Sequence, residues 1–287
     1  VKPGPPPPPP RAPEPAAPAQ TAPAAPEQAQ VPAPDPEYSD ENGPEPAARS
    51  TLVPVAAAVL LLAVAAVFSV YRHYTGALWA AFPLPGAHAV GLCADPSGGA
   101  LYFADPERQL LFSVSNDRGQ VLWVKGFPAA GLRSLAFDGS GFWSSDGKAL
   151  YRHEAAAGYE AVKKYQTDGS ADFLCWDGAA LYGLSSEGAF TVFSGGRSAE
   201  IGRLGLRPAA VSCGEGRLWL LGQDGRLREY DLSGGSPAPL RHADIARYMP
   251  EGLTDGLTVQ GEALWLSGGR PPELRKVEIS KLKFSEK

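Results

Sequence analysis

The chain is poor in the residues on which most sequence signatures of catalysis and metal binding depend. Its 287 residues include 3 cysteines, 4 histidines and 1 methionine. The cysteines are Cys93, Cys175 and Cys213, and none forms a CxxC pair or stands at metal-ligand spacing from a histidine. No nucleophile elbow, Ser-His-Asp order or glycine-rich phosphate loop occurs. We therefore predict no catalytic residue, no metal site and no cofactor, and binding is favoured over catalysis.

An excess of positive charge is also missing. The chain carries 26 Lys and Arg against 31 Asp and Glu, for a formal net charge of -5. Most of the negative excess lies in residues 1–50, so the remainder is close to neutral. Proteins that bind nucleic acid usually carry a basic patch or stripe. The composition therefore argues against nucleic acid as a partner.

Residues 1–50 contain more than half of the 29 prolines and show no apolar periodicity. Such a segment cannot bury enough apolar surface to offset its chain entropy, so we predict a disordered tail with polyproline II stretches. Two interpretations of this Pro/Ala-rich tail stay open. It is either a spacer or a ligand for a cytoplasmic partner with an aromatic groove.

An uncharged apolar run extends from Leu52 to Tyr71 and is long enough to cross a bilayer. We predict a transmembrane helix over residues 51–72, and a buried core helix or a cleaved signal peptide is less favoured. Arg49 and Arg72 flank the run symmetrically, so charge does not decide its orientation. A signal anchor would leave the tail in the cytoplasm and the C-terminal part, residues 73–287, outside the cytoplasm.

Residues 88–284 repeat one theme of short apolar strands separated by Asp-Gly or similar turns. Each unit has an aromatic second strand, as in "ALYFAD", "GFWSSD" and "RLWLLG", followed by a third strand and a weaker fourth strand. A spacing near 40 residues with four short strands predicts propeller blades, and a β-sandwich is the alternative. The aromatic residues that mark the second strands are Tyr102, Trp143, Tyr182, Trp219 and Trp265.

The fifth unit ends without a fourth strand, but a fourth-strand motif precedes the first unit. "ALWAAFP" at 77–83 copies "VLWVKGFP" at 121–128. An open ring would expose unpaired strand edges, which favour aggregation. We therefore predict an all-β, five-bladed propeller that is closed by an N-terminal strand at about 77–83. In the competing interpretation, residues 74–82 extend the membrane helix.

Loops that lead into the first strand of each blade should surround one mouth of the central channel. Mixed charges at these positions predict a ligand-binding rim, with a ring of apolar side chains below it. The alternative is that these are ordinary solvated loop residues and salt bridges. The predicted rim residues are His88, Arg133, Asp172, Arg207, Glu251 and Asp255.

The cysteines are interpreted as small residues of the inner strands. Cys93 and Cys175 occupy equivalent positions in blades one and three, which are not neighbours, and Cys213 falls one position off in blade four. A disulfide requires Cα atoms within about 7 Å. The alignment therefore predicts no disulfide.

The stretch "ADPSGGALYFADPERQLLFSVSNDRGQVL" resembles an NHL or YWTD-type propeller blade, in which an Asp-Gly turn precedes a Tyr-x-x-Asp strand. The order of tail, apolar run and propeller is similar to bacterial receptor-type Ser/Thr kinases with an external propeller, although no kinase motif is present. The resemblance implies a propeller that binds partners. Calcium-dependent lactonase propellers need asparagine ligands, and only Asn42 and Asn116 occur here.

Three functions follow as hypotheses. The first is a membrane-anchored, extracytoplasmic binding or sensor domain for a protein or an envelope ligand. The second is a structural scaffold in an envelope complex. The third is a glycosidase-like propeller hydrolase, in which Asp172, Asp255 and Glu251 would supply the acid and the base.

Overall fold

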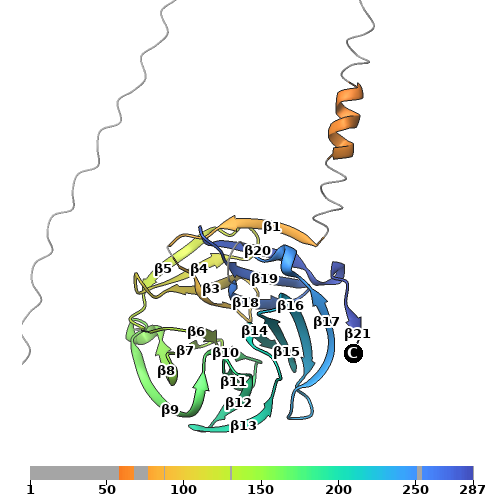
Figure 1. Cartoon of the computed structure of the whole chain (residues 1–287). Coiled ribbons are helices and arrows are strands. Elements are labelled where there is room, and N and C mark those ends of the chain that lie inside the picture. Colours follow the sequence, from red (N-terminus) through yellow and green to blue (C-terminus); the bar gives the residue numbers. More distant parts are fainter. Residues whose placement is uncertain (1–57, 68–76, 87, 130, 251–253, 287) are drawn as a thin grey trace, which may run out of the picture. The chain divides into compact units, whose positions relative to one another are not determined.

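The computed structural model describes residues 58–67, 77–86, 88–129, 131–250 and 254–286. Five antiparallel sheets surround a central axis, and each sheet is one blade of a propeller (Figure 1). The first strands of the blades contact one another in sequence around the channel, in the order β2, β6, β10, β14 and β18. The predicted five-bladed, all-β propeller is confirmed.

The strands follow the predicted repeat closely. Blade one contains β2 (Val90–Ala94), β3 (Ala100–Asp105), β4 (Leu110–Ser115) and β5 (Val121–Gly126). Blade two contains β6 (Ser134–Phe137), β7 (Gly141–Ser145), β8 (Gly147–Glu154) and β9 (Ala161–Ala171), with the short helix η1 (Ala155–Ala157). Blade three contains β10 (Phe173–Trp176), β11 (Leu181–Leu184), β12 (Ala189–Ser194) and β13 (Arg197–Arg203).

Blades four and five contain the remaining strands. Blade four contains β14 (Pro208–Gly214), β15 (Arg217–Gly222), β16 (Arg226–Asp231) and β17 (Ala238–Asp244), followed by η2 (Ala246–Tyr248). Blade five contains β18 (Thr254–Gln260), β19 (Ala263–Gly268), β20 (Glu273–Glu278) and β1 (Leu78–Pro83), followed in the chain by η3 (Ile279–Lys281).

The ring is closed by the N-terminal strand, as the duplicated motif predicts. β1 pairs antiparallel with β20, and Phe82 lies opposite Leu274 while Pro83 lies opposite Glu273. In Figure 1, β1 forms the outer edge of the blade that also contains β18, β19 and β20. The competing interpretation, in which residues up to 82 continue a membrane helix, is wrong for 78–82 because these residues are strand.

The chain then ends in a strand that sequence reasoning missed. β21 (Ser285–Glu286) pairs with β17, so that Arg241 lies opposite Glu286 and His242 opposite Ser285. Blade four therefore has five strands. A strand of two polar residues has no hydrophobic alternation, and for this reason the sequence pattern did not reveal it.

Apolar side chains from neighbouring blades pack against each other and form the core. Between blades five and one, Trp265 packs in one cluster with Leu101, Phe103 and Leu274, and all four are almost completely buried. The alternation of side chains along each strand places such residues on the faces that meet the next blade. The period-2 pattern of the sequence thus specifies the packing between blades.

Part of the predicted membrane segment is described as a helix. Residues 58–67 are helical, and their large apolar side chains, such as Leu61 and Leu62, are exposed. Within the described ranges, no helix is long and apolar enough to span a membrane. The predicted disordered tail, residues 1–50, and the two ends of the segment from Leu52 to Tyr71 lie outside the described residues.

Candidate functional site

The charged residues predicted to form a rim belong to one end of the central channel, which we call the closed end. Arg133 and Asp172 directly precede β6 and β10, and Asp255 lies near the start of β18. His88 and Arg207 lie in the loops that precede β2 and β14. Glu251 lies outside the described residues.

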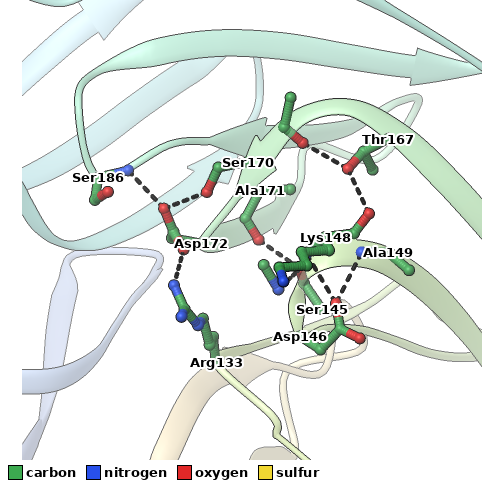
Figure 2. A network of polar contacts seen from close by, with 12 residues as sticks. Arg133, Ser145, Asp146, Lys148, Ala149, Thr167, Ser170, Ala171, Asp172 and Ser186 are labelled. Carbon is green, nitrogen blue, oxygen red and sulfur yellow. Dashed lines mark hydrogen bonds and ion pairs between the residues drawn. The ribbon is translucent and has the colours of Figure 1, made fainter.

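Arg133 and Asp172 form an ion pair across the boundary between blades two and three (Figure 2). Arg133 Nη1 donates to Asp172 Oδ1. The other carboxylate oxygen, Oδ2, accepts the hydroxyl of Ser170 at 2.5 Å and the backbone N–H of Ser186 at 2.8 Å. The Asp172 side chain is only 6% exposed, so its charge is engaged by protein donors on both oxygens.

These donors set the protonation state of Asp172. Burial alone would raise its pKa, but the hydrogen bonds from Ser170, Ser186 and Arg133 outweigh burial, and the pKa of Asp172 lies below its ordinary value. The carboxylate is therefore ionised at neutral pH. A general acid needs a pKa near the working pH, so Asp172 does not suit the acid role that the hydrolase hypothesis gave it.

The backbone of blade two approaches this ion pair closely. Gly147 has a positive φ of 90°, and a Cβ there would lie 3.1 Å from Asp172 Oδ1 and from Arg133 Cδ. Beside it, Ser145 Oγ donates to the carbonyl of Ala171 (Figure 2). Glycine is needed here because a side chain would displace the pair. The Arg133–Asp172 pair thus fastens blade two to blade three, while the hydrogen bond between Ser145 and Ala171 lies within blade two.

A second pair, His88 with Asp255, joins blades one and five. Nε2 of His88 lies 3.6 Å from Oδ2 of Asp255. Burial raises the pKa of Asp255, and His88 and Arg270 only partly offset this. Arg207, by contrast, is exposed and forms no ion pair with a described residue. The structure therefore brings the predicted rim residues together in pairs rather than around one shared ligand position.

The closed end leaves almost no room for a ligand. Its cavity has a volume of about 10 Å³, which is at the lower limit of the space that a single water molecule needs. Five apolar side chains, one from the first strand of each blade, line it from below and also line the larger cavity on the other side: Leu92, Leu135, Leu174, Val211 and Leu257. These are the apolar ring that the sequence predicts below the charges.

The other end of the channel, which we call the open end, holds a cavity of about 470 Å³. It is bounded by the apolar ring and widens toward the turns between the first and second strands of the blades. Three aromatic side chains, Phe137, Trp176 and Trp219, line it together with the polar side chains of Ser212, Thr258 and Gln260. This volume is within the range of ligand pockets.

Acidic residues surround the mouth of this cavity. Asp95, Asp177 and Glu215 come from the first turns of blades one, three and four, and the one basic residue among the lining residues is Arg217. The guanidinium Nε of Arg217 lies 3.9 Å from Glu229 Oε1, within its own blade. The mouth therefore carries a negative excess among its described residues.

Local turn chemistry explains why aspartates occur here. Asp95 Oδ1 accepts the N–H of Ser97 at 2.8 Å, while its Oδ2 accepts the hydroxyl of Tyr102 at 2.9 Å. In blade two, Asp138 Oδ2 accepts the indole N–H of Trp143 at 2.8 Å. Each aspartate thus closes its turn and orients the aromatic residue of the second strand.

Sequence reasoning missed the open end because it treated these aspartates only as turn residues. The signal was available, since an aspartate follows the first strand of blades one, two and three in equivalent positions: Asp95, Asp138 and Asp177. What the sequence could not show is the volume between the strands. That volume depends on how far apart the inner strands lie around the axis.

The prediction that no disulfide forms is wrong. Cys175 and Cys213 are bonded, with Cα atoms 5.3 Å apart. They belong to β10 and β14, the first strands of adjacent blades, which converge at the axis. The prediction compared only residues in equivalent positions, whereas neighbouring inner strands are staggered by one residue. Both cysteines line the open end, as does the free Cys93, whose thiol pKa is raised by burial and by Asp95.

A second large cavity, of about 440 Å³, lies between the outer strands of blades three and four. Arg203, Arg228 and Arg241 line it, but each has a carboxylate partner: Glu200, Asp224 and Glu229. Its positive charge is therefore compensated. Among the described residues, no group of three or more His, Cys, Asp or Glu could hold a metal ion.

The sequence matches no protein-family model and no curated protein. The fold is similar to that of the crystal structure of Myxococcus xanthus glutaminyl cyclase, with a TM-score of 0.53 and 16% sequence identity over 73% of this chain and 96% of that chain. The Cps50 (Swd1) β-propeller domain of Myceliophteria thermophila gives a TM-score of 0.41 and 11% identity over 66% of this chain and 65% of that one. At such identities the likeness to the cyclase shows the propeller fold alone.

Proposed function

We propose that this chain is a membrane-anchored binding domain, whose propeller holds a protein or an envelope ligand at the open end of its channel. The cavity of about 470 Å³ carries the proposal, since it is the larger of the two channel cavities and its mouth faces solvent. A permanent scaffold in an envelope complex would use the same surface and would differ in the lifetime of the complex.

Three observations support the membrane anchor and the extracytoplasmic position of the propeller. The uncharged segment from Leu52 to Tyr71 is helical over its described part, 58–67. The Cys175–Cys213 disulfide is typical of an oxidising compartment outside the cytoplasm. β1, the strand nearest to this segment in sequence, also exposes Trp79, whose side chain is 67% accessible; exposed tryptophan is frequent near membrane interfaces.

A cavity-filling substitution tests the binding site. A Cβ on Gly214 would meet no atom within 4 Å, and Gly214 lines the open end, so a Phe side chain at this position begins in open space and should fill part of the cavity. Gly126→Phe is the matched control, because Gly126 is equally free of neighbours and lies at the end of the outer strand β5, away from the channel.

The experiment immobilises the full chain in detergent and identifies the envelope proteins it retains by mass spectrometry. We expect Gly214→Phe to abolish the retention of a specific protein or envelope component that wild type and Gly126→Phe both retain. Equal retention by all three chains would show that the open end is not the binding site.

A further inference from the structure

We propose that the open end takes a segment of a partner protein that inserts one apolar side chain into the cavity and places lysine or arginine side chains against the carboxylates at its mouth. The proposal rests on the proposed function and adds the chemistry of the ligand. Three features carry it: the apolar inner part of the cavity, an unused hydroxyl within it, and the charge at the mouth.

The inner part of the cavity suits an apolar side chain. The ring of four leucines and a valine closes it, and Phe137, Trp176 and Trp219 form part of its walls. An apolar group that enters such a site releases water from both surfaces, which is the main favourable contribution to binding. A charged group in the same place would lose its hydration without a partner. The charged part of the ligand must therefore stay at the mouth.

One polar side chain in the wall is open to the cavity. Thr258 is 5% exposed and lines the cavity, and its hydroxyl forms no hydrogen bond with any described residue. The neighbouring hydroxyl of Ser212 already accepts the N–H of Val259 at 3.1 Å. The hydroxyl of Thr258 can therefore bond a polar group of an inserted segment.

Two of the carboxylates at the mouth, Asp177 and Asp95, are held in place by hydrogen bonds. Asp177 Oδ1 accepts the N–H groups of Ala179 and Ala180, both at 2.8 Å. Burial alone would raise the pKa of Asp95, but its hydrogen bonds from Ser97 and Tyr102 outweigh burial and lower the pKa. Carboxylates that are already fixed lose little freedom when a cation binds, so less free energy is spent on ordering them.

The arrangement of these charges favours several cations around a central apolar group. Asp95, Asp177 and Glu215 belong to three different blades and surround the mouth. A metal ion would need several ligands that converge on one point, and no such group of three exists among the described residues. A peptide segment with basic residues on both sides of one apolar residue matches the surrounding charges.

The test uses three acetylated, amidated pentapeptides: Lys-Gly-Phe-Gly-Lys, Glu-Gly-Phe-Gly-Glu and Lys-Gly-Gly-Gly-Lys. Their affinities for the full chain in detergent are measured by isothermal titration calorimetry at low and high salt. We expect the first to bind at least about tenfold more tightly than the other two, since rim charges and a buried anchor each contribute to affinity. Its advantage over the acidic peptide should shrink at high salt.

Matched variants test which residues of the open end are responsible for binding the basic peptide. Asp177→Asn with Glu215→Gln should weaken the binding of Lys-Gly-Phe-Gly-Lys by about 3- to 10-fold, and the amide oxygen that Asp177→Asn introduces can still accept the turn hydrogen bonds. Glu187→Gln removes an exposed carboxylate from the turn between β11 and β12, at the closed end, and should leave the affinity unchanged. Thr258→Val keeps the side-chain shape and should weaken binding by a few-fold.

Two results would overturn the proposal. One is binding of the acidic peptide as tight as that of the basic peptide, and the other is no binding of Lys-Gly-Phe-Gly-Lys. If Gly214→Phe nevertheless abolishes retention of an envelope component, the proposed function stands and only the ligand chemistry is wrong. If Gly214→Phe changes neither retention nor peptide binding, the open end is not a binding site and both proposals fail.

Discussion

The two ends of the channel contain the same kinds of charged residue but use them differently. At the closed end, Asp172 bonds Arg133 of the neighbouring blade, and Asp255 lies beside His88 across another boundary. At the open end, Asp95 and Asp177 bond the backbone of their own turns. A carboxylate whose donors lie within its own turn leaves the channel clear, whereas one that pairs across blades closes it.

The comparison also shows that both ends join blades five and one, whereas each of the other boundaries named below is joined at one end. The closed end joins blades two and three through Arg133 and Asp172. The open end joins blades three and four through the Cys175–Cys213 disulfide. It also joins blades five and one through Gln260, whose Nε2 donates to the carbonyl of Asp95 at 3.0 Å. The cavity can remain wide because covalent and backbone-directed contacts hold its wall.

Removal of the disulfide should have the largest effect on stability. The bridge closes a loop with a sequence separation of 38, so Cys175→Ala with Cys213→Ala should lower the free energy of unfolding by about 2–4 kcal/mol. Urea unfolding of the full chain measures this. Cys93→Ala, which breaks no bridge, is the control. A double variant as stable as the control would mean that the wall of the open end does not depend on the bridge.

Equivalent substitutions at the two ends should lower the free energy of unfolding by different amounts. Asp172→Ala removes the acceptor of three donors in a buried position and should cost about 2 kcal/mol. Asp177→Ala removes turn hydrogen bonds near solvent and should cost about 1 kcal/mol or less. Chemical denaturation compares the two. Equal costs would contradict the distinction between carboxylates that join blades and carboxylates that close turns.

The smallest predicted effect concerns two carboxylates of the closed end, Asp172 and Asp255, which should change the stability of the fold with pH in opposite directions. The pKa of Asp172 is lowered by folding, so its contribution to stability is present above its ordinary pKa, about 4, and is lost as the pH falls through the folded value. The pKa of Asp255 is raised, mainly by burial, so its ionisation costs stability as the pH rises through its folded value.

Asp255→Asn should therefore raise stability at pH 7 by on the order of 0.5 kcal/mol and have no effect near pH 3. Asp172→Asn should lower stability at pH 7 and approach wild type at low pH. Thermal unfolding between pH 3 and 7 measures both. Parallel pH profiles for the two variants would show that the opposite pKa shifts are incorrect.

The sequence predicts the fold better than the site, for a physical reason. Strand alternation and turn residues are local, and the predicted second strands coincide with β3, β15 and β19. The duplicated motif also predicts that β1 pairs in blade five. These features depend on a few residues near each other in the chain, or on one motif that occurs twice.

The site depends instead on distances between blades. Arg133 and Asp172 directly precede the first strands of their blades, but the sequence could not show that they pair and that this end is closed. The one-residue stagger that brings Cys175 to Cys213 was missed for the same reason. The distances between residues on opposite sides of the channel are set by the packing of five sheets. A local sequence pattern therefore cannot predict them.

The pairing of β1 with β20 has a consequence for biosynthesis. β1 leaves the ribosome before every other strand of the propeller, yet its partner is among the last to be made, since Pro83 lies opposite Glu273. At about 5–20 residues per second, the intervening chain takes roughly ten to forty seconds to synthesise. During that interval β1 has an unpaired edge, and a truncated product that ends before β20 would keep that edge permanently.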